Sequence, residues 1–228
     1  MIKKLLLAGA VLTAIGQPVY AATITIGDPA PGGLRSVFVT GKIEPGDNER
    51  FRWSVASLSD RNVVVWLTSP GGNIVAGLDI SKQIRARRFA TFVDDSCASV
   101  CGLMWLAGDR RMVVRTAHIG FHAAYDGSTG EVSSAGNALV GAYLNFLGFS
   151  DDAIGFLTDT PPDNSIQWLT AEVAEQYGIT AQVLSPPKAN RADVKISGQA
   201  PPWLLYYIPA VAMGILTLGF IAKTRARS

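Results

Sequence analysis

Short apolar runs alternate with helix-like segments in the middle of the chain, and this alternation restricts it to few folds. The run from Asn62 to Thr68 is rich in β-branched residues and is typical of a buried strand. The segment from Gly72 to Arg88 carries spaced apolar residues and a basic end, which predicts a helix. Phe89 to Val93 and Arg111 to Arg115 repeat the strand pattern. Strands and helices that alternate in this way predict an α/β domain.

The turn after the first of these strands is a candidate anion pocket. Pro70 ends the strand, and Gly71 and Gly72 follow it. Glycine lets a backbone N–H approach a ligand closely, and the start of the next helix presents the positive end of its dipole. The turn therefore predicts either an oxyanion pocket or an ordinary β–α connection.

Ser99 lies at the predicted start of a helix that runs to about Ala107. Asp94, Asp95 and Ser96 precede it and are expected to supply capping or first-turn residues. A serine in this place has backbone N–H groups beside it, which suits a nucleophile whose intermediate carries an oxyanion. On this segment alone, a plain N-cap serine is the simpler interpretation.

The two histidines of the chain, His118 and His122, follow the next strand pattern. In an extended segment both rings share one face, because side chains alternate along a strand. A lone histidine is more often a structural or surface residue. A histidine placed after a strand and downstream of a candidate nucleophile is a better candidate for a general base.

Taken in order, these elements resemble the proteolytic subunit of the Clp protease and its relatives in the ClpP/crotonase superfamily. The resemblance covers roughly residues 37–184. Its motifs are Ser-Pro-Gly-Gly at 69–72 with Gly77, Ala98-Ser99, Leu106-Ala107-Gly108, His122 and, more weakly, Trp168-Leu169-Thr170 and residues 175–179. It implies an α/β domain with a ClpP/crotonase-like core of short ββα units.

The resemblance assigns roles to four residues. It implies that Ser99 is the nucleophile, that His122 is the general base, and that the N–H groups of Gly71 and Val100 form the oxyanion hole. His118 falls where the family has no catalytic residue. A peptide or protein substrate follows from these roles, with no cofactor and no metal.

The third member of the family's triad is less well matched. The nearest carboxylate is Asp163, which is displaced by about one position, and Asp159 is a rival. Because of this displacement, a non-catalytic module that binds peptides or a membrane partner is an alternative function. Crotonase-like acyl-CoA chemistry is a weaker alternative, and so is a Ser/Lys dyad with Lys82, which lies on the first long helix.

Cys97 and Cys101 bracket Ser99 and are the only cysteines of the chain. We expect a disulfide between them if the domain is exported to an oxidising compartment. Four residues apart on a regular helix, two Cβ atoms lie roughly 6 Å apart, against about 3.8 Å in a disulfide. The bond therefore requires Cys97 to precede the regular helix, and two buried free thiols are the alternative.

Both ends of the chain carry membrane-targeting patterns. Residues 1–21 have two lysines, an apolar run and small residues before Ala22, which predicts a signal peptide cut after Ala21, or else a retained anchor. A proline-rich linker at 185–202 leads to an uncharged apolar segment at 203–222, long enough to span a bilayer. The basic tail at 223–228 predicts a cytoplasmic end. We expect a single-pass protein of the inner (cytoplasmic) membrane, with residues 22–184 in the periplasm.

The charge balance of the chain argues against nucleic acid as a partner. The net charge is +2, and five positive charges lie in the two flanking segments, which leaves −3 for the rest of the chain. Nothing in this balance indicates nucleic-acid binding, and an ATPase partner is not expected outside the cytoplasm.

A helix expected at residues 132–148 matches the family's ring-forming handle, which predicts a homo-oligomer, with an ordinary buried helix as the alternative.

Overall fold

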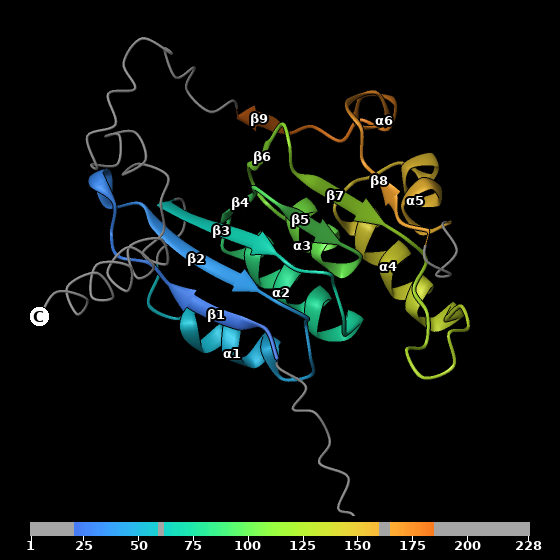
Figure 1. The fold of residues 1–228 in the computed structure, drawn as a ribbon, viewed down its shortest axis with the longest axis horizontal. Helices are drawn as coiled ribbons and strands as arrows, with labels where there is room; N and C mark the ends of the chain where they lie inside the picture. Colours follow the sequence, from blue (N-terminus) through green and yellow to red (C-terminus); the bar gives the residue numbers. More distant parts are fainter. Residues whose placement is uncertain (1–20, 59–61, 160–164, 185–228) are drawn as a thin grey trace, which may run out of the picture.

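The computed structural model describes residues 21–58, 62–159 and 165–184 (Figure 1). The strands are β1 (Thr23–Ile26), β2 (Arg35–Thr40), β3 (Val63–Thr68), β4 (Ala90–Val93), β5 (Ser96–Ala98), β6 (Arg111–Val114), β7 (His118–Phe121), β8 (Gln167–Trp168) and β9 (Gln182–Leu184). The helices are α1 (Asp47–Ser54), α2 (Ile74–Ala86), α3 (Val100–Leu106), α4 (Ser134–Phe146), α5 (Asp151–Thr158) and α6 (Ala171–Gln176), with a 3-10 turn η1 (Pro31–Gly33). The α/β class is confirmed.

Six strands form one sheet in the order β1-β2-β3-β4-β6-β9, and a smaller sheet has the order β5-β7-β8. In the larger sheet β1 runs antiparallel to β2, and the other neighbours are parallel, with Val37 opposite Val65. Since the parallel strands follow one another in space, right-handed crossovers place α1, α2 and α3 on the same face (Figure 1). The turns after β3 and β4 therefore leave the sheet at a common edge.

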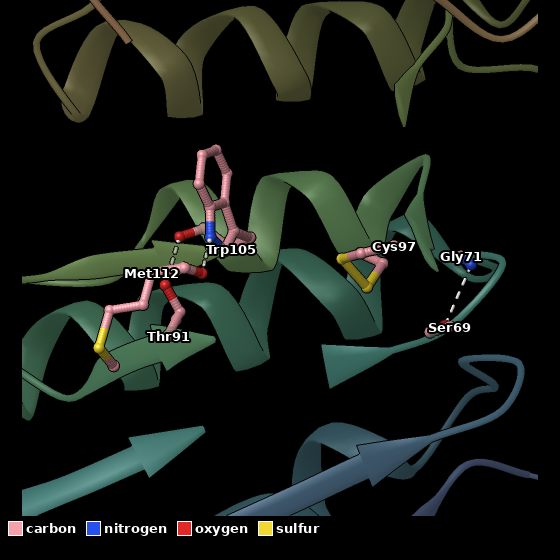
Figure 2. The surroundings of a disulfide bond; sticks show 7 residues. Ser69, Gly71, Thr91, Cys97, Trp105 and Met112 are labelled. Carbon is pink, nitrogen blue, oxygen red and sulfur yellow. Dashed lines mark hydrogen bonds between the residues drawn. A yellow bond between two sulfur atoms is a disulfide. The ribbon is translucent and has the colours of Figure 1, made fainter. Parts of the chain in front are cut away.

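Alternating burial in the strands fixes which residues form the core. Val63, Val65 and Leu67 of β3 point into the main core beneath the sheet, where they are almost completely buried. Helix α3 packs into the same core along its whole length, and all of its residues are buried. Its far end is fastened to the sheet, because the Trp105 carbonyl accepts a hydrogen bond from Thr91 (Figure 2).

Side chains cap the first turns of two helices, α2, which lies within the predicted segment from Gly72 to Arg88, and α6. In α2 the Asn73 side chain accepts a hydrogen bond from the Ala76 N–H, and in α6 Thr170 does the same for the Val173 N–H. Helix α1 begins at Asp47, which is its first residue rather than its cap. Gly46 occupies the capping position instead, with φ 94°.

The segment before α3 differs from the expectation. Asp94, Asp95 and Ser96 do not cap a helix, because residues 96–98 form strand β5 beside β7. The prediction failed because local residue preference favoured a helix start, whereas pairing with the distant β7 decided the conformation.

Among the residues that the structure describes, no helix is long and apolar enough to cross a membrane. The predicted signal peptide up to Tyr20, the linker at 185–202, the membrane segment at 203–222 and the tail at 223–228 lie outside the described residues. Asp163 lies outside them as well.

Candidate active site

One cavity of about 570 Å³ brings together three of the predicted site residues. Gly71, Ser99 and His122 all line it, although they come from turns after three different strands. Val100 is the residue after Ser99 and is buried. Lys42 and Glu44 also line the cavity, and their side chains form an ion pair at 2.7 Å.

Ser99 occupies a strained turn between β5 and α3. Its φ is 59° and its ψ is −129°, a combination that non-glycine residues rarely adopt and that costs about 1–3 kcal/mol. Two backbone hydrogen bonds hold it there: the Ser99 N–H donates to the Gly120 carbonyl at 2.8 Å, and the Ser99 carbonyl accepts from the Gly102 N–H at 2.9 Å.

The Ser99 side chain does not cap α3, although the residue stands at the N-cap position. Interpreting Ser99 as a plain N-cap serine is therefore wrong. A sharp turn from strand to helix is a geometry that presents a nucleophilic hydroxyl to a cavity. The turn leaves the hydroxyl at the cavity wall, half-buried and not engaged as a cap.

Gly71 approaches the nucleophile closely. A Cβ atom at this position would lie 2.6 Å from the Ser99 Cβ and 2.8 Å from the Ala98 carbonyl oxygen. The φ of Gly71 is 96°, a second reason why only glycine fits. On the other side, the Gly71 carbonyl accepts a hydrogen bond from the Ile43 N–H at 2.8 Å, and the Asn73 N–H donates to the Ile43 carbonyl at 2.7 Å.

The two N–H groups expected to form the oxyanion hole differ in their hydrogen bonding. The Val100 N–H belongs to the first residue of α3 and has no partner within the helix. The Gly71 N–H donates to the Ser69 hydroxyl at 3.0 Å (Figure 2). Before Gly71 can donate to an oxyanion, the buried Ser69 hydroxyl must release it.

His122 is oriented by the main chain. Its Nδ1 lies 2.7 Å from the Ala123 carbonyl oxygen. Because a carbonyl oxygen only accepts hydrogen bonds, Nδ1 must carry the proton, and Nε2 of the neutral ring is left as the acceptor. Within the described part of the chain no hydrogen bond joins the ring to Ser99. Such catalytic contacts often form only when substrate is bound.

His118 and Lys82 lie away from the cavity. The His118 side chain is exposed, and its ring packs edge-on against Trp168 of β8 with centroids 5.7 Å apart. Lys82 is exposed on α2 and does not line the cavity. Asp159 follows α5 directly and is also absent from the cavity lining.

Cys97 and Cys101 form a disulfide, as predicted (Figure 2). Cys97 belongs to β5 and so precedes the regular helix, and the two Cα atoms lie 5.1 Å apart. Both cysteines are fully buried. The alternative of two free thiols is wrong, and the covalent bond closes a short loop with Ser99 at its centre.

Removing the disulfide is expected to loosen the turn that carries Ser99. Closing a loop of this length stabilises the fold by about 2 kcal/mol in the chain-entropy model, similar to the cost of the strain at Ser99. In the Cys97→Ala/Cys101→Ala variant we expect Tm to fall by roughly 6 °C and the rate at which a fluorophosphonate phosphonylates Ser99 to fall about tenfold.

Val39→Ala is the control for this experiment, because Val39 is a buried residue of β2 outside the cavity lining. It should lower Tm without a matching loss in the rate of phosphonylation. If the double cysteine variant is phosphonylated as fast as the parent, the disulfide does not position Ser99.

Two contributors to the site were missed in the sequence. The Ser69 hydroxyl could have been found, because serine two residues before a glycine often bonds to the backbone there. The Ala123 carbonyl left no signal, since a main-chain atom carries no residue preference.

In the part of the chain that is described, no three His, Cys, Asp or Glu side chains gather in a metal-binding group. No protein-family model matches the chain.

Proposed function

We propose that this chain is a serine hydrolase of the ClpP/crotonase type that cleaves peptides outside the cytoplasm. The observation that carries the proposal is Ser99, held in a strained strand-to-helix turn with its hydroxyl unused as a cap, in one cavity with His122. The order of a Gly-Gly turn, a serine turn and a histidine after successive strands supports the family resemblance. Anchoring by residues 203–222 in the inner membrane, with the domain in the periplasm, is part of the proposal.

The chemistry follows from the groups in the cavity. The Ser99 Oγ attacks a peptide carbonyl while Nε2 of His122 takes the hydroxyl proton. The Val100 N–H, and the Gly71 N–H once Ser69 releases it, donate to the developing oxyanion. His122 then passes the proton to the leaving amine, and water hydrolyses the acyl-enzyme by the reverse proton movements.

Oligomer formation is supported by one helix surface. Helix α4 carries no charged residue, and its Leu139 and Phe146 are exposed. An apolar surface of this kind fits assembly of several copies, as expected from the family's handle.

A non-catalytic peptide-binding module is the second candidate. It is favoured by the bond from the Gly71 N–H to Ser69, which occupies one oxyanion donor, and by the missing hydrogen bond between Ser99 and His122. In this function the cavity would hold an extended peptide without cleaving it.

Labelling with a fluorophosphonate separates the two functions. The full-length protein in detergent should form a covalent adduct one phosphonyl group heavier than the free chain, and the Ser99→Ala variant should form none. His118→Ala is the matched control, since its ring lies away from the cavity, and it should label like the parent. An unlabelled parent protein would favour the binding module.

Substrate choice is expected to depend on a small apolar cavity beside the nucleophile. It measures about 20 Å³ and is lined by Ser99 and His122 together with Ile74, Val100, Leu103, Phe121, Ala124, Val140 and Leu157. About 10–15 Å³ of such volume holds one water molecule, so this cavity has room for one methyl group. We expect alanine to be preferred before the scissile bond.

The preference is measured with fluorogenic peptides that differ only in alanine or leucine at that residue. Each surplus methylene in a fitted apolar pocket costs about 1–3 kcal/mol, so kcat/KM should be at least tenfold higher for alanine. Leu103→Ala should enlarge the cavity and raise the relative rate on leucine. A parent protein that cleaves after leucine as fast as after alanine contradicts this assignment.

A further inference from the structure

The nitrogen of Ala22 lies in a buried acidic site. Ala22 is fully buried, and its N–H donates to the Asp47 Oδ2 at 3.1 Å. Asp47 is itself fully buried at the start of α1. The preceding residue, Ala21, is exposed, so the chain passes from the surface into this site within one residue.

The Asp47 carboxylate has three partners. Its Oδ2 also accepts a hydrogen bond from the Glu44 N–H at 2.8 Å, and its Oδ1 contacts the guanidinium of Arg50, which is itself half exposed. A buried carboxylate is stabilised best when each oxygen faces a charged donor. As long as the peptide bond before Ala22 is intact, the group that Ala22 presents to Oδ2 is a neutral amide.

We propose that Asp47 is the acceptor for a new N-terminus produced by cleavage between Ala21 and Ala22. Hydrolysis breaks the C–N bond of that peptide: the Ala21 carbonyl gains the hydroxyl of a water molecule, and the Ala22 nitrogen gains its hydrogen. The free amine, with an ordinary pKa of about 8, takes up a further proton at pH 7. The nitrogen that would carry this charge already lies 3.1 Å from the Asp47 Oδ2.

The position of the cut follows from burial. A cut before Ala21 leaves a neutral amide at Ala22. The new ammonium then lies on the exposed Ala21 or on an earlier residue, where it gains no stabilisation from Asp47. A cut after Ala22 removes a residue that is packed into the main core. This site therefore favours one terminus, and that terminus is the one expected from the signal-peptide pattern in the proposed export of the chain.

The same contacts lead from the new terminus to the candidate active site. Glu44, whose N–H is bonded to Asp47, lines the cavity, and its neighbour Ile43 is hydrogen-bonded on both sides of the Gly71–Gly72 turn. Cleavage would thus fasten one wall of the cavity and the turn that carries an expected oxyanion donor. Export and assembly of the site become linked steps.

The test uses full-length protein made with its own N-terminal segment and purified in detergent. N-terminal sequencing should give Ala22 as the first residue. The α-amine should react with an amine-directed succinimidyl ester at pH 7 at least tenfold more slowly in the native protein than in the same protein unfolded in denaturant. This comparison needs no variant and holds even if Asp47 variants fail to fold.

A double-mutant cycle, measured by Tm, then isolates the contribution of the ion pair between the Ala22 ammonium and Asp47. Asp47→Asn should lower Tm by roughly 5 °C more in the processed chain than in a chain kept uncleaved by Ala21→Arg. Glu49→Gln is the matched control, because this exposed carboxylate of α1 pairs with Arg52 on the surface, and its effect should be the same in both chains.

A different first residue, an α-amine as reactive as in the unfolded chain, or equal Tm losses for Asp47→Asn in both chains would each overturn the proposal. None of these measurements uses hydrolase activity. A chain with a protected Ala22 amine that takes up no fluorophosphonate would contradict the proposed function and still support this inference.

Discussion

Replacing Ser99 with alanine is expected to lower kcat/KM for peptide substrates by on the order of 10⁴-fold or more. The hydroxyl is the only part of the residue that changes. The strained φ of 59° remains available to alanine at a similar cost, so Tm should stay within about 2 °C of the parent value. A large loss of activity without loss of stability identifies the hydroxyl as the reacting group.

His122→Ala should cause a loss of similar size, because nucleophile and base act as one unit. The double variant Ser99→Ala/His122→Ala should be no slower than either single variant. His118→Ala keeps one histidine and removes the other, and its kcat/KM should stay within about twofold of the parent. These values are measured by following peptide cleavage with each purified variant. An active Ser99→Ala protein would refute the catalytic assignment.

The role of a third residue can be examined in the same series. The Ala123 carbonyl already holds Nδ1 of His122, so Asp163→Ala is expected to lower kcat/KM by less than about tenfold. A loss as large as that of His122→Ala would show that Asp163 is the orienting carboxylate, as the family resemblance implies.

Several elements could be predicted because their causes are local. The predicted segment from Gly72 to Arg88 contains α2, whose first turn is held by neighbouring backbone and side-chain groups, and a β-branched run such as Val63–Thr68 needs only burial to form a strand. The meeting of Gly71, Ser99 and His122 in one cavity was also expected, because turns after neighbouring parallel strands reach the same edge of a sheet.

The conformation of the site depends on distant contacts and could not be predicted in the same way. The backbone of Ser99 is held by the Gly120 carbonyl, and β5 exists because it pairs with β7. Neither partner is close in sequence, so local preference suggested a capped helix start instead. The occupied state of the Gly71 N–H depends on how the turn at Ser69 folds, which residue types alone leave open.

Gly71→Ala is expected to damage the site severely, because the added methyl group would meet the residue that carries the candidate nucleophile. The new Cβ would lie 2.6 Å from the Ser99 Cβ and 2.8 Å from the Ala98 carbonyl oxygen, and neither neighbour is a flexible side-chain end. Either the Gly71 turn or the Ser99 turn must move, which costs about 3–5 kcal/mol in crowding and strain. A shift of about 1 Å between nucleophile and oxyanion donor lowers the rate by about 10²-fold or more.

Gly148→Ala provides the matched control, because Gly148 shares the left-handed backbone, with φ 88°, but a Cβ there would meet nothing within 4 Å. Both variants carry a similar backbone strain of about 1 kcal/mol, so the difference between them measures crowding at the site. Gly148→Ala should lose a few degrees of Tm and keep its kcat/KM. Gly71→Ala should lose at least about 10²-fold in kcat/KM and react slowly with a fluorophosphonate. If both variants keep full activity, the Gly71 turn does not adjoin the reacting hydroxyl, and the oxyanion hole must be built from other N–H groups.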